Sequence, residues 1–167
     1  MSKKTIVVER LSDITKEDFA AFGQIVGLDN YDPLEDFEHL NYWTQNVNLT
    51  ASHDQIDLGL LLAKPMEPGF RVKEMERHPS AWEIFFPLKG QFIFVLAPTD
   101  LKASVPDNNG IRAFFMDGSL GVALPNGNWH WPPVAVGGPA KMSILRIGHD
   151  LTVTNIASLE NEIELVM

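Results

Sequence analysis

Short strand-like runs separated by turn residues dominate the chain from about residue 40 onward. Clusters of proline, glycine, asparagine and aspartate fall between many of these runs, as at 106–110 and 125–127. Many short strands at regular spacing are typical of a β-sandwich or a β-barrel. The chain is therefore predicted to be mainly β, with strands at about 39–49, 57–63, 70–76, 82–86, 91–97, 111–116, 120–124 and 141–147.

The two ends of the chain carry weaker patterns. Residues 6–8 predict a short strand, and Thr15-Lys-Glu-Asp18 resembles a capping box, which predicts a short helix that Gly23 can end. The last segment, 158–167, fits either a short helix or an edge strand. We find no internal repeat and no linker, so residues 1–167 are predicted to form a single domain.

Composition narrows the class of partner. The net charge of −9 argues against a nucleic-acid surface, which needs clustered Lys and Arg. No apolar run approaches the ~20 residues of a membrane helix, so we expect no membrane partner. The chain has no cysteine, and its start does not resemble a signal peptide, so a cytoplasmic protein is expected. Thirteen basic residues still permit a local cationic pocket for a small acid.

Two stretches combine ionisable side chains with apolar neighbours. Glu76 and His78 are two residues apart, and Glu83 follows inside the apolar stretch 82–86. Further on, the stretch 125–130 ends in His130 after a turn. Carboxylates and imidazoles are costly to bury unless they are paired or hold a metal. We therefore expect the two stretches to converge inside a barrel and to offer a divalent metal (Ni, Mn, Fe or Zn) the ligands Glu76, His78, Glu83 and His130.

A small carboxylate would also need a cation. Lys89 and Arg112 are the candidates, since Arg112 shares one face of its strand with Phe114, although either side chain can equally be solvated. Trp129 and Trp131 flank His130, where they either wall a pocket or belong to the core.

These motifs resemble those of the cupin superfamily. Glu76-x-His78, Glu83 and Gly90 follow the first cupin motif, with Glu76 in place of a histidine, and Pro125-x-Gly127-x-x-His130 matches the second. Over most of its length the chain resembles the ureidoglycolate lyase family of that superfamily. The resemblance is carried by residues 11–26, 39–41, 76–79 (ERHP), 85–90 (FFPLKG), 112–114, Gly118, Gly121 and 129–130.

The resemblance implies a cupin-like (RmlC-type) β-barrel or jelly roll, a homodimer and a divalent metal, usually nickel. It also implies a carbon–nitrogen lyase that cleaves ureidoglycolate to glyoxylate and urea in allantoin and purine catabolism. His78, His130 and Glu76 would then be catalytic, as ligands or as base. Lys89, Arg112, Asn41 and Trp131 would contact the carboxylate substrate.

The chain departs from the family pattern at four positions. Glu83 stands where Gln is common, Lys73 where the residue is often His, Leu62 where Arg is expected, and Trp131 where some members have His. Polar groups that read a substrate contribute strongly to specificity, so the substrate can differ. Two other functions stay open: a metal-dependent cupin isomerase or oxygenase, and a small-molecule-binding barrel without catalysis.

Overall fold

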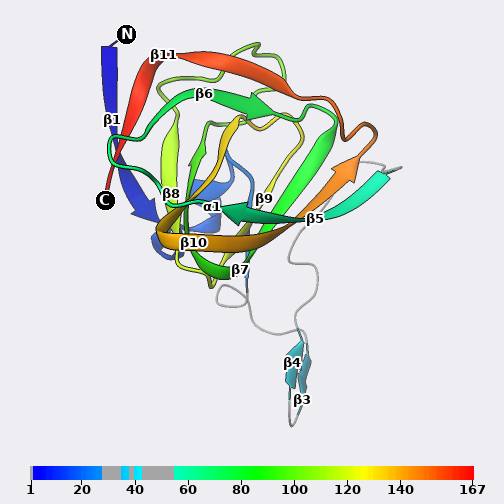
Figure 1. The fold of residues 1–167 in the computed structure, drawn as a ribbon. Coiled ribbons are helices and arrows are strands. Elements are labelled where there is room, and N and C mark those ends of the chain that lie inside the picture. The colour runs from blue at the N-terminus through cyan, green and yellow to red at the C-terminus, as the bar shows by residue number, and fades with distance from the viewer. Residues whose placement is uncertain (1, 28–34, 38–39, 43–54) are drawn as a thin grey trace.

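In the computed structural model, residues 2–27, 35–37, 40–42 and 55–167 are described. Strands form almost all of the regular structure (Figure 1). The elements are β1 (Ser2–Arg10), η1 (Leu11–Asp13), α1 (Lys16–Phe19), β2 (Gln24–Val26), β3 (Glu35–Phe37), β4 (Leu40–Tyr42), β5 (Gln55–Ala63), β6 (Arg71–Arg77), β7 (Ala81–Leu96), β8 (Arg112–Met116), β9 (Gly121–Leu124), β10 (His130–Gly148) and β11 (Asn155–Val166). Neither described helix has the length and hydrophobicity to cross a membrane.

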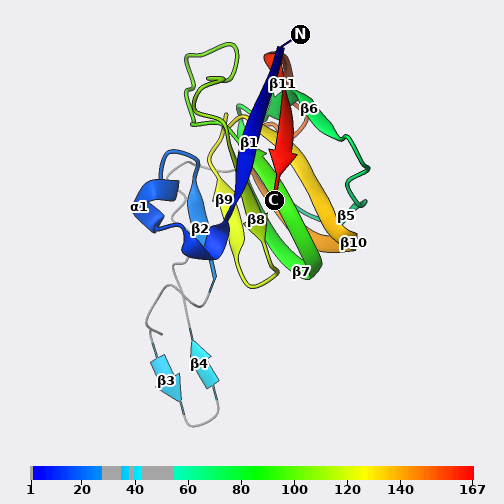
Figure 2. The ribbon, with the colours of Figure 1, turned by 90° about the vertical axis from the view of Figure 1, so that its left-hand side faces the viewer.

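One large sheet curls into a barrel. Its strand order is β2-β9-β7-β8-β1-β11-β6-β10-β5, and an additional pairing of β7 with β10 closes the ring. Figure 2 shows β1 running between β8 and β11, with which it pairs in parallel. β3 and β4 form a separate two-stranded hairpin. The predicted mainly β, cupin-like barrel with a short N-terminal helix is therefore confirmed.

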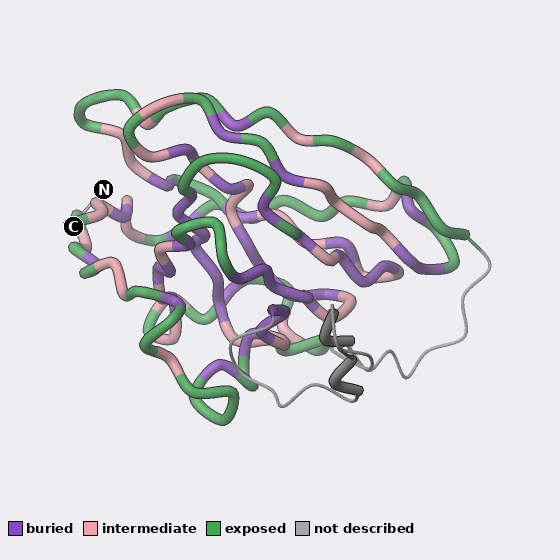
Figure 3. Tube along the Cα trace, turned by 90° about the horizontal axis from the view of Figure 1, so that it is seen from below, coloured by how far each residue is buried: buried purple, intermediate pink, exposed green. Residues whose placement is uncertain are grey.

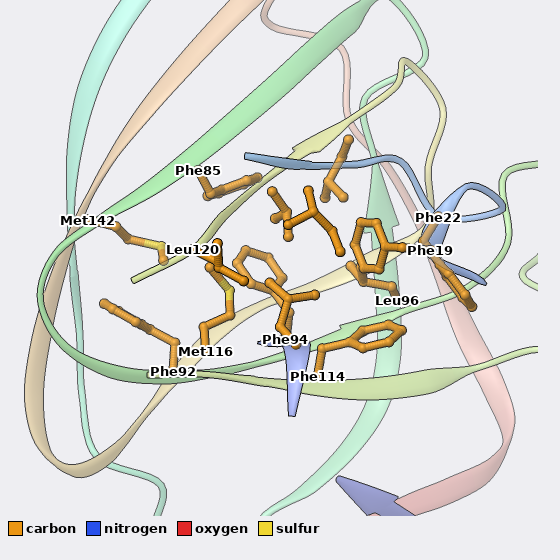
Figure 4. Packing of buried hydrophobic residues seen from close by; sticks show 14 of the residues in the cluster. Phe19, Phe22, Phe85, Phe92, Phe94, Leu96, Phe114, Met116, Leu120 and Met142 are labelled. Carbon is orange, nitrogen blue, oxygen red and sulfur yellow. The ribbon is translucent and has the colours of Figure 1, made fainter. Parts of the chain in front are cut away.

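Both faces of the second half of β7 are buried. Phe92, Phe94 and Leu96 point into one apolar cluster, which Figure 4 shows together with its members Phe85, Phe114 and Met142. The alternate residues Ile93 and Val95 point into a second cluster, beneath β1, β6 and β11. Burial on both faces explains the near-continuous apolar run at 91–97. The buried residues accordingly lie in the middle of the molecule, as the purple segments of Figure 3 show.

The sequence located most strands, but not their lengths. The runs predicted at 82–86 and 91–97 are one strand, β7, and the undecided C-terminal segment is the strand β11. β10 begins at His130, well before the predicted 141. The strand continues through Pro132 and Pro133 because both lie at a register shift, where a missing N–H is tolerated. Thr15 caps α1 as predicted, by accepting a hydrogen bond from the Asp18 N–H. The strand expected at 39–49 falls mostly outside the described residues.

Candidate metal and catalytic site

The two motifs predicted to converge are joined by one backbone and one side-chain hydrogen bond. The N–H of Gly127 donates to the carbonyl oxygen of His78 over 2.9 Å, and the side chain of Asn126 donates to the carbonyl of Pro79 over 3.2 Å. Gly127 has a φ of 78°, which glycine adopts without strain. The turn at 125–129 is thereby fixed against the end of β6, which positions His130 beside His78.

Asn128 anchors the same turn from inside the protein. Its buried side-chain amide donates to the carbonyls of Phe22 and Ala97, at 3.0 and 2.9 Å, and lies 3.0 Å from the hydroxyl of Thr99. No pattern in the sequence predicted a role for this residue. Its signal was weak, because an Asn beside a Gly is equally typical of an exposed turn.

The four predicted ligands lie together. His78 Nε2 is 3.5 Å from Glu83 Oε1, and His130 Nε2 is 3.3 Å from Glu83 Oε2. Glu76 Oε1 approaches His130 Nε2 from the rim at 3.7 Å, consistent with the direct register pairing of Glu76 with His130. Glu83, His78 and His130 are buried, whereas 29% of the Glu76 side chain is exposed. Glu76 is thus the member of the cluster that solvent reaches.

The tautomers of both histidines are assigned from the contacts of their Nδ1 atoms. His130 Nδ1 lies 3.2 Å from the carbonyl oxygen of Asn128, and His78 Nδ1 lies 3.3 Å from that of Val153. A carbonyl oxygen only accepts, so the Nδ1 of His130 carries the proton. The Nδ1 of His78 also lies 3.2 Å from the hydroxyl of Thr154, which can accept or donate, and we assign it the proton because its carbonyl partner cannot donate. Both Nε2 atoms therefore present a lone pair towards Glu83, the arrangement by which metal-binding histidines are held.

Burial shifts the ionisation of this cluster towards neutral forms. It lowers the pKa of His130 to about 4, and it lowers the pKa of His78, against the opposing charge of Glu76. It raises the pKa of Glu83 to about 8, although the charge of Arg146 acts in the other direction. At neutral pH without a cation, both imidazoles are then neutral and Glu83 is protonated. The contacts between the imidazoles and Glu83 are therefore not ion pairs.

Without a cation, this cluster has fewer hydrogen-bond donors than acceptors. Two Nε2 lone pairs face one carboxyl group, whose single proton can reach only one of them. A divalent cation would satisfy both lone pairs and stabilise the ionised carboxylates. Glu76, His78 and His130 each place one ligand atom within 4.8 Å of the others. The residues thus fit a divalent metal, with Glu83 against both imidazoles.

The four predicted substrate contacts are dispersed. Arg112 lies against Glu9, with hydrogen bonds of 2.8 and 2.6 Å, and over the rings of Phe22 and Phe114. Lys89 is exposed and pairs in register with Lys141, six positions along β7 from Glu83. Trp131 borders a cavity of about 130 Å³ that Glu76 also lines. Asn41 lies in β4, where side chains are outside the described structure. Of these four residues, Trp131 is the one that the described structure places on a cavity shared with a cluster residue.

Two of the departures from the family pattern lie away from the cluster. Lys73 is exposed and sits 3.5 Å from Glu162, and Leu62 is exposed on β5. Trp129, which precedes His130, belongs to the core under the guanidinium of Arg77. The departure at Glu83 is the one that enters the cluster.

Arg146 is a further residue near the cluster that no sequence motif predicted. It lies directly opposite Glu83 in the β7–β10 register, and its charge acts on both Glu83 and His78. Directly opposed residues of paired strands point to the same face, so Arg146 shares the face of Glu83. A single arginine in an apolar strand does not reveal which residue lies opposite it, because that depends on the register of the paired strands.

Comparisons with known proteins agree with the motifs. Residues 3–164 match the sequence model of the ureidoglycolate lyase family. Among curated relatives, the ureidoglycolate lyase of Stutzerimonas stutzeri is 31% identical over 80% of this chain and 77% of its own length. The ureidoglycolate lyase of Pseudomonas entomophila is 31% identical over 80% of this chain and 78% of its own length.

Solved structures resemble the chain more distantly. A 3,4-ketoisomerase from Helicobacter canadensis aligns with a TM-score of 0.45 and 12% identity, over 77% of this chain and 85% of that one. RmlC from Streptococcus suis aligns with a TM-score of 0.42 and 8% identity, over 59% of this chain and 46% of that one.

Proposed function

Because the chain belongs to the ureidoglycolate lyase family, we propose that it cleaves ureidoglycolate to glyoxylate and urea, in the catabolism of allantoin and purine nitrogen. The observation that carries the proposal is the convergence of Glu76, His78, Glu83 and His130 in one partly enclosed cluster. A cytoplasmic location is part of the proposal, in keeping with a chain that has no cysteine for an oxidising compartment to cross-link.

The reaction needs one proton to be taken up and one to be delivered. The substrate hydroxyl loses its proton as the carbon–oxygen double bond forms, the carbon–nitrogen bond breaks, and the urea nitrogen leaves with that electron pair and gains a proton. Glu76 is the group we assign to this transfer, because it is the solvent-accessible carboxylate of the cluster. It takes the hydroxyl proton and returns it to the leaving nitrogen, so atoms and charge balance.

His78, His130, Glu83 and Glu76 would hold the divalent metal, which we propose to be nickel on the family resemblance. When bound, the metal supplies a positive charge that lowers the pKa of a hydroxyl group and stabilises developing negative charge. The chain holds each Nε2 in place through the Nδ1 contacts with Val153 and Asn128. Trp131 lines a cavity together with Glu76, where it would meet the substrate.

An assay for products tests this proposal. Purified protein, loaded with nickel, is incubated with (S)-ureidoglycolate, and glyoxylate and urea are measured separately. Equal release of both products, above the spontaneous rate, is expected. A protein that binds metal but releases neither product would favour the isomerase or oxygenase alternative, and one that binds no metal would favour a non-catalytic barrel.

We also propose that the homodimer forms through β5. Alternate residues of this strand, Ile56, Leu58, Leu60 and Leu62, are 62–80% exposed. β5 ends the sheet order of the described strands, so its outer edge has no described partner. Exposed apolar edge strands of this kind invite pairing with another chain, and patches of several hundred Å² commonly mark interfaces. A second copy related by a two-fold axis could pair β5 with its own equivalent in antiparallel register.

Light scattering coupled to size exclusion tests this interface. The wild-type chain is expected at twice its monomer mass, and Leu60→Glu at the monomer mass. Val105→Glu is the control, because Val105 is 55% exposed in a loop away from β5, and it should stay dimeric. A wild-type monomer, or a dimeric Leu60→Glu variant, would contradict the assignment.

A further inference from the structure

We infer that Arg146, on β10, binds the carboxylate of the substrate at the Glu83 side of the cluster. The inference deepens the proposed function and rests on it for the identity of the acid. It concerns a residue that no part of the sequence resemblance includes.

The position of Arg146 is set by three elements. Its register partner on β7 is Glu83, and its register partner on β5 is Asp57, so these three side chains form a row across the sheet. Its Nη1 donates to the carbonyl of Leu151 over 3.1 Å, which fixes the guanidinium from the loop after β10. The side chain is 28% exposed, so it lies between the buried cluster and solvent.

Arg146 keeps donors for an anion. The described contacts, to Leu151 and at 3.4 Å to Asp57, use two of the five N–H donors of a guanidinium. Asp57 is 52% exposed, so its attraction for Arg146 is screened by water. Arginine binds carboxylates with two parallel hydrogen bonds, which also orients them. The residue therefore offers N–H donors to a carboxylate on the face of the sheet that carries Glu83.

The charges of the cluster favour such a cation. Ionised Glu76 and Glu83 carry two negative charges, which a divalent metal only cancels. Arg146 then adds one positive charge beside the cluster, only partly offset by the exposed Asp57, which suits a substrate with one carboxylate. The other candidates are less suited, because Arg112 is held by Glu9 and Lys89 is exposed six positions along β7 from Glu83.

Binding of glyoxylate, the proposed product, tests the inference by titration calorimetry with nickel-loaded protein. Arg146→Met should weaken glyoxylate binding at least tenfold and raise the KM for ureidoglycolate by a similar factor, with a smaller change in kcat. Arg146→Lys should restore part of the binding. Arg71→Met is the matched control, since Arg71 is 25% exposed and pairs with Glu164 at the far end of β6. It should bind glyoxylate like wild type.

The outcomes separate this inference from the proposed function. If wild type binds glyoxylate without cleaving ureidoglycolate, and Arg146→Met loses that binding, Arg146 stands as the anion contact while the proposed reaction fails. If wild type cleaves ureidoglycolate and Arg146→Met keeps the wild-type KM and glyoxylate affinity, the inference is overturned. Failure of wild type to bind any small monocarboxylate would also overturn it. Metal content measured for each variant shows whether a lost affinity reflects lost metal instead, which would equally count against a carboxylate contact.

Discussion

The backbone N–H of Gly127 donates to the carbonyl oxygen of His78 over 2.9 Å, and this bond joins the two halves of the candidate site. The halves lie 49 positions apart in sequence, at the end of β6 and before β10. Together with the bond from Asn126 to Pro79, it places the imidazoles of His78 and His130 with ring centres 5.7 Å apart. The site thus depends on a turn whose shape is set by a glycine.

Gly127→Ala should destabilise the protein and loosen the site. A residue with a Cβ pays about 1–2 kcal/mol in left-handed backbone, and the new Cβ would lie 2.4 Å from Cδ2 of Leu101. Urea denaturation measures the stability. Gly138→Ala is the control, since no neighbouring heavy atom lies within 4 Å of its added Cβ. Equal stability of the two variants would contradict the role given to Gly127.

Asn128→Ala should lower the free energy of unfolding by about 2–4 kcal/mol, because buried carbonyls of Phe22 and Ala97 would lose their side-chain donor. Asn126→Ala, which removes one partly buried hydrogen bond, should cost about 1 kcal/mol. Chemical denaturation of both variants gives the comparison. A smaller loss for Asn128→Ala than for Asn126→Ala would show that Asn128 does not anchor the turn.

Glu83→Gln should stabilise the metal-free protein while weakening its metal binding. A carboxyl group whose folded pKa is raised by burial to about 8 destabilises the fold at every pH above its unfolded pKa of 4.5, and the amide removes this cost, on the order of 3 kcal/mol at pH 7. Thermal unfolding in chelator measures the gain, and nickel titration should show at least tenfold weaker binding. Unchanged nickel affinity would remove Glu83 from the ligand set.

The pair of Glu9 and Arg112 should make stability fall in acid. The hydrogen bond from Arg112 holds the pKa of Glu9 below its ordinary value of 4.5. A carboxylate with a depressed folded pKa contributes stability above the unfolded pKa and loses it as the pH falls through the folded pKa. The difference in stability between wild type and Glu9→Gln should therefore be constant above about pH 6 and shrink below pH 4.5. A difference that is the same at pH 3 and pH 7 would contradict this pairing.

Much of this arrangement could be predicted from local sequence, and the rest depends on long-range pairing. Alternation and turn residues located the strands, and the motif spacing identified Glu76, His78, Glu83 and His130, which the structure brings together. Arg112 shows the limit. It does pack against Phe22 and Phe114, but its guanidinium is held by Glu9, 103 positions away on the parallel neighbour β1. Arg146 could not be predicted for the same reason, because it lies opposite Glu83 only through the register in which β10 pairs with β7.

The most direct test of the account is the turnover of (S)-ureidoglycolate by wild type and by His130→Ala, both nickel-loaded and with matched circular dichroism spectra. We predict equal release of glyoxylate and urea by wild type. His130→Ala should lower kcat/KM by at least a hundredfold, about 2.7 kcal/mol in transition-state free energy. Undiminished turnover by a folded His130→Ala variant would contradict the assignment of the reaction to this cluster.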